Sequence, residues 1–400
     1  MTTTINNEHN KLNVPNKREQ NQTCLDSAER EGLRPKGNVP NLRFKEFEGE
    51  WEKCILGDIT ENFNLRNKDK IQYPMFSVTN DRGFVPQSEQ FEGRDMVGED
   101  IKAYKIIHTN DFAYNPARIN VGSIAMYTGE KPCMISSLYV CFKTTKEVNN
   151  EWLMQLLKTP KMNYYYNVNG EGGVRVYLFY PNFARIRMSI PKIEEQKKIA
   201  KLLNLIDERI ATQNKIIDRL QSLIKGIAQK IVRNNKPNVR LAECLECKSS
   251  TLQESEVCEQ GTYPVYGANG IVGYLDNYST EGEAVYIIKD GSGVGTVSYV
   301  TGKCSATGTL NTLQAKEGYS LQYLYYMLKV FNFEPYKTGM AIPHIYFKDY
   351  GKAKVFCPSY TEQLQYARLL YAIDNKLSIE QNILTELSLQ KQYLLRQVFI

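Results

Sequence analysis

Histidine is scarce in this chain, with three residues among 400, and tryptophan occurs only twice. His9, His108 and His344 are far apart in the sequence, which argues against a histidine-based metal centre or catalytic triad. No apolar run reaches the roughly 18–20 residues that a membrane-spanning helix needs. The polar N-terminus also has no apolar signal core. The sequence therefore predicts a protein that neither spans a membrane nor uses a histidine-based active site.

The nine cysteines are scattered and odd in number. Without a signal core, they indicate reduced thiols and a cytoplasmic location. Cys244-x-x-Cys247, with Cys258 nearby, has the spacing of half a zinc site. No second pair of this kind and no neighbouring histidine completes it, so we expect no metal and no cofactor in this chain.

Motifs of catalysis are incomplete. The glycine-rich stretch 291–295 lacks the Lys-Ser/Thr ending of a phosphate-binding loop and the strand and helix of a dinucleotide site. Asn115-Pro116-Ala117-Arg118 begins like the Asn-Pro-Pro-Tyr motif of adenine methyltransferases, but the second proline and the aromatic residue are missing. No nuclease-like cluster and no nucleophile with a placed base is found. The sequence predicts a chain that is not an enzyme by itself.

Two long segments, 191–231 and 358–398, carry apolar residues at alternating three- and four-residue steps. This heptad spacing predicts long helices that pack against another helix. A constant shift of 167 residues superimposes the two segments, and it aligns Glu195 with Glu362. The predicted seam residues are Ile199, Leu203, Ile206, Ile210, Gln213, Ile217, Leu220, Leu370, Ile373, Leu377, Glu380, Leu384 and Leu387.

The regions before the two helices repeat as well. Tyr73-Pro74 recurs as Tyr263-Pro264, and Val121-Gly122 recurs as Val294-Gly295, in the same order. The predicted parts are a disordered polar leader at 1–37, a first head at 38–190, a long helix at 191–235, a second head at 236–357 and a second long helix at 358–400.

This internal repeat defines the expected fold class. We expect an α+β protein with two pseudo-repeated domains, each a mixed, twisted β-sheet with short helices. The two long helices separate the domains and form an antiparallel coiled coil, because the chain must return through the second head. The polar seam residues Gln213 and Glu380 would meet near the middle and set the register.

The net charge is only +6, but residues 191–235 hold ten Lys or Arg against five Asp or Glu. This excess fits a solvated helix face or a polyanionic partner. Two related heads at a set separation could each bind a short DNA half-site. Alternatively, they could form a pseudo-symmetric interaction scaffold that binds no DNA, or the recognition part of a single-chain methyltransferase or nuclease.

Candidate DNA-binding residues lie in turns and loops of both heads. Asn and Arg pair with adenine and guanine edges, while Ser and backbone amides suit phosphate. The candidates are Asn80, Asp81, Arg82, Asn115, Arg118, Asn120, Ser123, Asn269, Lys289, Ser292, Thr296, Lys303 and Thr307.

Several segments together resemble the specificity subunit of type I restriction–modification systems. They are VPNLRFKEFEGEWEKCILGDI from residue 39, YNPARINVGSI from residue 114, IPKIEEQKKIAKLLNLID from residue 190, and CPSYTEQLQYARLLYAID from residue 357. Their order, duplicated along the chain, carries the resemblance, which extends over about residues 38–400.

The resemblance implies that each head is a target recognition domain for one half of a bipartite double-stranded DNA sequence. The paired helices would fix the gap and dock two methyltransferase (modification) subunits, which carry S-adenosylmethionine. Two restriction subunits that use ATP and Mg²⁺ can join such a complex. The polar leader is a departure from the family, and no particular base contact can be carried over.

Overall fold

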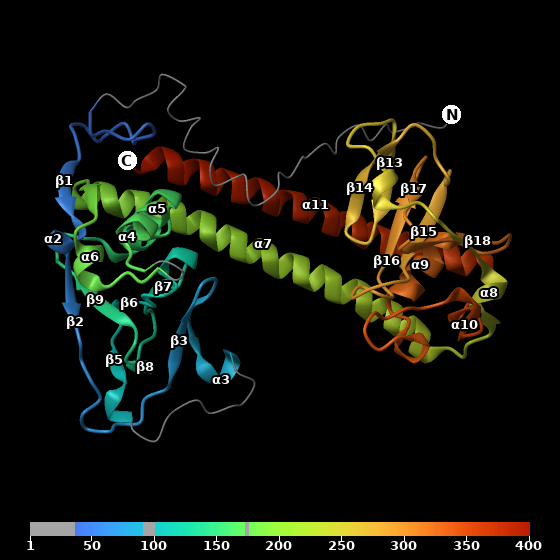
Figure 1. Cartoon of the computed structure of the whole chain (residues 1–400), viewed down its shortest axis with the longest axis horizontal. Coiled ribbons are helices and arrows are strands. Elements are labelled where there is room, and N and C mark those ends of the chain that lie inside the picture. The colour runs from blue at the N-terminus through green and yellow to red at the C-terminus, as the bar shows by residue number, and fades with distance from the viewer. Residues whose placement is uncertain (1–36, 91–100, 173–175) are drawn as a thin grey trace. The chain divides into compact units, whose positions relative to one another are not determined.

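The computed structural model describes residues 37–90, 101–172 and 176–400. Nearly all of the leader predicted at 1–37 lies outside this part of the chain. The described elements are helices and short strands in mixed sheets (Figure 1), so the α+β fold class predicted from the sequence is confirmed. No helix among the described residues is long and apolar enough to cross a membrane.

The chain forms two compact units that do not follow its linear order. Unit 1 comprises the chain up to Glu208 together with Ser388–Ile400, and unit 2 comprises Arg209–Leu387. The long helices α7 (Ile193–Asn234) and α11 (Tyr360–Val398) are therefore each divided between the units. The sequence predicted consecutive domains, whereas each head packs with one part of both helices, because the apolar seams extend the core of each head.

Unit 1 is built on a four-stranded antiparallel sheet of order β2-β9-β6-β7, with three two-stranded pairs, β1-β10, β3-β4 and β5-β8. The strands are β1 (Glu52–Ile55), β2 (Thr60–Phe63), β3 (Phe76–Thr79), β4 (Gly83–Pro86), β5 (Lys105–Ile107), β6 (Phe112–Tyr114), β7 (Ile124–Met126), β8 (Cys133–Ile135), β9 (Val140–Thr144) and β10 (Arg187–Ile190). The short helices are α2 (Leu56–Ile59), α3 (Gln87–Gln90), η1 (Ile101–Ala103), η2 (Ile119–Val121), α4 (Asn150–Leu157), α5 (Pro160–Asn169) and α6 (Tyr180–Ala184).

Unit 2 has the corresponding four-stranded sheet, of order β12-β18-β15-β16, beside a three-stranded sheet β14-β13-β17 and the pair β11-β19. The strands are β11 (Val239–Arg240), β12 (Leu245–Ser249), β13 (Tyr263–Gly267), β14 (Gly270–Leu275), β15 (Glu283–Ile288), β16 (Val297–Thr301), β17 (Ser305–Ala306), β18 (Leu310–Ala315) and β19 (Lys354–Val355). The short helices are α8 (Leu241–Cys244), η3 (Glu254–Glu256), α9 (Leu321–Lys329), η4 (Glu334–Tyr336) and α10 (Phe347–Tyr350). In both heads the first and last strands along the chain pair with one another, β1 with β10 and β11 with β19, which agrees with the repeat predicted from the sequence.

Within each unit, the parts of the two long helices run antiparallel (Figure 1), and in unit 1 Lys391 pairs with Asp207. In unit 1, Ile199 and Leu203 share a core with Val398 and Phe399. In unit 2, the core includes apolar residues of both helices, among them Ile217, Ile224, Leu370 and Leu377. Every predicted seam position is buried or half-buried.

The two polar seam residues contact one another. Gln213 Nε2 donates to the backbone oxygen of Glu380 at 3.0 Å and also to its carboxylate. Lys376 pairs with the same carboxylate from the preceding turn. Hydrogen bonds lower the pKa of Glu380, with the larger contribution from Lys376 and the smaller one from Gln213. The seam therefore holds an ionised carboxylate beside Gln213.

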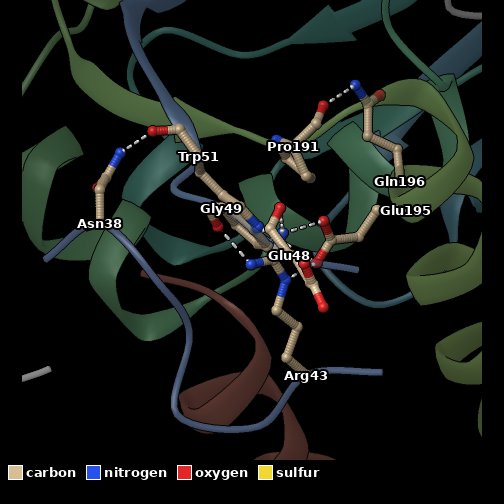
Figure 2. A network of polar contacts seen from close by, with 8 residues as sticks. All are labelled: Asn38, Arg43, Glu48, Gly49, Trp51, Pro191, Glu195 and Gln196. Carbon is tan, nitrogen blue, oxygen red and sulfur yellow. Dashed lines mark hydrogen bonds and ion pairs between the residues drawn. The ribbon is translucent and has the colours of Figure 1, made fainter. Parts of the chain in front are cut away.

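A buried polar network joins the start of the described chain to α7 (Figure 2). Arg43 donates from Nε and Nη2 to the two carboxylate oxygens of Glu195, both at 2.8 Å. Trp51 Nε1 donates to the same carboxylate at 3.2 Å, and Arg43 also donates to the backbone oxygens of Glu48 and Gly49. Glu195 is only 2% exposed, so this network anchors the segment 38–51 to the first turn of α7.

A glutamine at the start of each long helix binds backbone groups of its head. In unit 1, Gln196 Nε2 donates to the Pro191 oxygen and Oε1 accepts from the Asn149 amide, both at 2.8 Å. In unit 2, Gln363 makes the equivalent bonds to the Pro358 oxygen and the Ser320 amide, both at 2.9 Å. Asn149 and Ser320 cap α4 and α9, so the same device fixes a capped helix of each head to its long helix.

Candidate nucleic-acid interface

In the first head, the predicted turn and loop form one continuous surface. Residues 80–82 connect β3 to β4, and residues 115–123 connect β6 to β7. Ser123 Oγ donates to the Val78 oxygen at 2.7 Å. A Cβ on Gly122 would lie 3.2 Å from the Asn80 oxygen, and Gly122 has a φ of +101°. The close approach of these two loops therefore depends on glycine at this position.

The side chains of this surface divide into structural and available groups. Asn115 Oδ1 accepts from the Ala117 amide at 3.0 Å, which shapes the loop, and Asn120 donates to Asn167 Oδ1 at 3.0 Å. The exposed Arg118 makes no side-chain hydrogen bond or ion pair within the described residues. Arg118 is thus the cation of this loop that a phosphate or a guanine edge could bind.

The turn carries two opposite charges. Asp81 and Arg82 are both exposed, and the Arg82 amide donates to Thr79 Oγ1 at 3.1 Å. Hydrogen bonds to the Asp81 carboxylate lower its pKa; the largest contribution comes from its own backbone amide and a smaller one from the Thr79 hydroxyl. An ionised carboxylate repels phosphate but can accept from a cytosine amino group, so this turn suits a base edge better than the DNA backbone.

Two of the predicted contact residues point inward, and those predictions are corrected. Ser123 and Thr307 are each only 1% exposed. Ser123 bonds to the neighbouring strand β3, and the Thr307 hydroxyl lies 2.9 Å from the Thr309 hydroxyl. Both side chains fill the space beneath their loops and cannot reach DNA without a change of the backbone.

In the second head, the candidates lie at several places. Asn269 is exposed in the turn between β13 and β14, and Ser292 and Thr296 are exposed in the loop between β15 and β16. Lys289, half-buried, starts that loop. Lys303 lies 3.6 Å from Glu281 and 4.7 Å from the Tyr278 ring, so its charge is already partly matched within the head.

The glycine-rich loop is shaped by its neighbours. Gly291 has a φ of +96° and donates to the Pro343 oxygen at 3.0 Å. A Cβ on Gly295 would lie 3.0 Å from the Phe333 ring. Beside this loop is an open groove of about 430 Å³ whose lining includes Lys329 and Lys337. Lys337 pairs with Glu334, which lines the same groove, and Lys329 Nζ lies 3.9 Å from the Asp374 carboxylate, so the charge of both lysines is partly matched within the head.

A pair of equivalent hairpins beside these loops was missed by the sequence analysis. In the first head, Glu171 and Tyr177 exchange two backbone hydrogen bonds of 2.8 Å; in the second, Thr338 and His344 exchange bonds of 2.9 and 2.8 Å. The shift of 167 residues that aligns the long helices also aligns these hairpins. Extending that shift towards the N-terminus would have revealed them, although the ring types differ between the copies.

The cysteines form no metal site among the described residues, where no cluster of three or more His, Cys, Asp or Glu has metal-binding geometry. Cys244 lies 3.9 Å from Cys357, sulfur to sulfur, and both are buried. The neighbouring thiol of Cys244 is therefore Cys357, three residues before α11.

Sequence comparison identifies the family to which this arrangement belongs. Residues 48–222 and 235–389 each match the type I restriction modification DNA specificity domain. The chain belongs to this specificity-domain family. The two matches cover both heads and much of both long helices, so the family assignment rests on the duplicated plan.

Individual relatives agree with the specificity-domain assignment. The chain is 26% identical over 204 residues to the putative type I restriction enzyme MjaX specificity subunit of Methanocaldococcus jannaschii, a match covering 48% of each chain. It is 29% identical over 130 residues to the type I restriction enzyme EcoprrI specificity subunit of Escherichia coli, covering 32% of this chain and 31% of that relative. The chain thus spans about half or less of the length of the curated relatives it matches.

The fold of the specificity-domain family is found in solved structures as well. The crystal structure of a type I restriction–modification S subunit from M. genitalium superposes with a TM-score of 0.62 and 16% identity, covering 90% of this chain and 99% of that chain. A structure from a study of complex assembly of the type I R-M system gives a TM-score of 0.53 at 13% identity. At these identities the likeness concerns the fold alone.

Proposed function

We propose that this chain is the DNA-recognition subunit of a type I restriction–modification complex. The observation that carries the proposal is the duplication itself: both halves match the specificity domain, and each half pairs a head with a long helix. Each head would bind one half of a bipartite target, and α7 and α11 would set the gap between the halves. A non-DNA-binding scaffold has no comparable support.

In the first head, the exposed Arg82 and Arg118 are the cations we assign to DNA contact. The amide side chains of Asn115 and Asn120 hold the loop in shape. In the second head, we assign DNA contact to Ser292 and Thr296 on the glycine-rich loop and to the lysines beside that loop. Because the loops of the two heads differ in sequence, the two half-sites would differ too.

The chain would contribute recognition and no chemistry. Two modification subunits carrying S-adenosylmethionine would dock on the helices and adjoining surfaces, and together they would methylate adenine. Restriction subunits that use ATP and Mg²⁺ would add cleavage. Exposed apolar side chains of α11, such as Ile379, Ile383 and Leu389, offer contact area for such partners.

Methylome sequencing with the gene present and then deleted tests the proposal. We expect one split motif to lose its adenine methylation in the deletion strain and to regain it on complementation. Replacing the second head, residues 239–357, with that of another specificity subunit should change one half of the motif only. An unchanged methylome would contradict the proposed function, and a change in both halves would contradict recognition by separate heads.

A further inference from the structure

Each head presents a pair of stacked rings on the hairpin described above, and all but the half-buried His344 are exposed. In the first head, Tyr177 and Phe179 stack at 6.2 Å between ring centroids and 12° between planes, and they are 37% and 47% exposed. In the second head, His344 and Tyr346 stack at 6.5 Å and 19°, with side-chain exposures of 36% for His344 and 47% for Tyr346. The geometry is preserved although neither ring is identical in the two heads.

The residue between the two rings fixes each hairpin in its head. Leu178 is fully buried and its amide donates to the Pro116 oxygen at 3.0 Å. Ile345 is 1% exposed and its amide donates to the Lys289 oxygen at 2.9 Å. Pro116 and Lys289 belong to the candidate DNA loops, so both ring pairs are tied by a backbone hydrogen bond to the equivalent loop.

A basic residue accompanies each ring pair. Lys348 Nζ lies 5.2 Å from the Tyr346 ring centroid, and Arg118 follows Pro116 by two residues in the first head. The Asp290 carboxylate lies 2.6 Å from His344 Nδ1 and is engaged within the head. Exposed rings beside available cations match duplex DNA, which offers phosphates next to apolar sugar and base edges.

The tip of the second hairpin extends the same surface. Met340 is fully exposed and Ile342 is 57% exposed, while Gly339 has a φ of +88° that allows the sharp turn. Apolar side chains of this type contact thymine methyl groups or enter between base steps. Residues 173–175, the equivalent positions in the first head, lie outside the described part of the chain.

We propose that the ring pairs Tyr177/Phe179 and His344/Tyr346 are DNA-contact elements, one in each head, acting beside the candidate loops. This inference rests on the proposed function and adds residues to it. It predicts that loss of one ring weakens binding and reduces discrimination at one half-site only.

The test uses the full chain co-purified with its modification subunits. Fluorescence anisotropy measures its affinity for duplex DNA that contains the motif identified by methylome sequencing. Three duplexes are compared: intact, first half scrambled, and second half scrambled. Tyr346→Ala should weaken binding to the intact duplex by about tenfold. It should also reduce the loss of affinity that scrambling one of the two half-sites causes. Phe179→Ala should do the same for the other half.

Conservative variants separate the ring from its hydroxyl. Phe179→Tyr and Tyr346→Phe exchange the residues that the two heads use naturally, and they should stay within about twofold of the parent protein. Leu138→Ala removes an apolar side chain that is 78% exposed and lies outside the hairpins, and it should also stay within this range. Thermal unfolding of each variant checks that the heads remain folded.

Several results would overturn the inference. Alanine variants that bind like the parent, or that weaken both halves equally, would contradict a half-site contact by these rings. Loss of the modification subunits from the Tyr346→Ala complex would show that the hairpin contacts protein instead. Should the unaltered complex fail to distinguish intact from scrambled DNA, the proposed function itself would fail, independently of the rings.

Discussion

Replacing Glu195 by alanine should destabilise unit 1 strongly. The carboxylate is 2% exposed and accepts three hydrogen bonds, two from Arg43 and one from Trp51. Removing one partner of a buried ion pair costs about 3–5 kcal/mol, mainly because the other charge stays buried. Arg43 keeps its backbone acceptors and is 14% exposed, so we expect the lower end, about 3 kcal/mol.

Tryptophan fluorescence isolates this effect. Trp51 and Trp152 are the two tryptophans of the chain and both belong to unit 1, where their rings meet edge to face at 6.4 Å. In a domain of 150–250 residues, 1 kcal/mol shifts the melting temperature by about 2–4 °C. A cost of about 3 kcal/mol should therefore lower the fluorescence-detected midpoint by about 6–12 °C.

The repeat supplies the matched control. Glu362 occupies the position equivalent to Glu195, but it is exposed and accepts from the Ser359 amide at 3.1 Å and from the Ser359 hydroxyl. Glu362→Ala should cost only about 1 kcal/mol, as loss of a helix-capping contact does, and it should leave the tryptophan transition unchanged. Equal small shifts in both variants would refute the assignment of Glu195 as a buried anchor.

Three further perturbations test the remaining contacts. Gln363→Ala leaves the buried Ser320 amide and the half-buried Pro358 oxygen without this partner. It should lower the stability of unit 2 by about 2 kcal/mol, measured by denaturant unfolding, and an unchanged midpoint would contradict the role of Gln363. Since Lys376 lowers the pKa of Glu380, this carboxylate stabilises the fold at neutral pH. The stability that this carboxylate contributes should decrease as the pH falls below the ordinary carboxyl range. The doubly substituted Gln213→Leu, Glu380→Leu protein should lose that pH dependence. If acid lowers the stability of both proteins equally, the Gln213–Glu380 pair does not cause the pH dependence. Arg118→Ala should weaken DNA binding and reduce its salt dependence, whereas an identical salt slope would exclude a phosphate contact.

The long helices and the repeat could be predicted because both follow from local spacing. A heptad stripe specifies a helix with one apolar face whatever lies around it. The shift of 167 residues also predicted which residues correspond, and Gln213 and Glu380, which it aligns, contact one another. The sequence could not show that each compact unit takes part of both helices, since that depends on which core the seams join.

The candidate site was predicted less completely. Turn residues such as Arg82 and Arg118 are exposed, but Ser123 and Thr307 face inward, because their loops fold over the strands in a way that residue type does not encode. The ring pairs were not predicted, because Phe179 and Tyr346 are both aromatic but are different residue types. The shift of 167 residues aligns them, and the matching backbone hydrogen bonds that fix each hairpin establish their equivalence.

The glutamines at the starts of α7 and α11 bear on how such a protein can diversify. Gln196 and Gln363 bind a carbonyl oxygen and an amide hydrogen of the peptide backbone. Every amino acid offers the carbonyl oxygen, as Pro191 and Pro358 do here, and every amino acid except proline offers the amide hydrogen. An unrelated head could therefore be spliced onto the same helix with its attachment intact, provided that it presents a main-chain amide at the same point. In unit 1 such a head would also need to supply the side-chain contacts that Arg43 and Trp51 make with Glu195, whereas the glutamine bonds require only backbone groups.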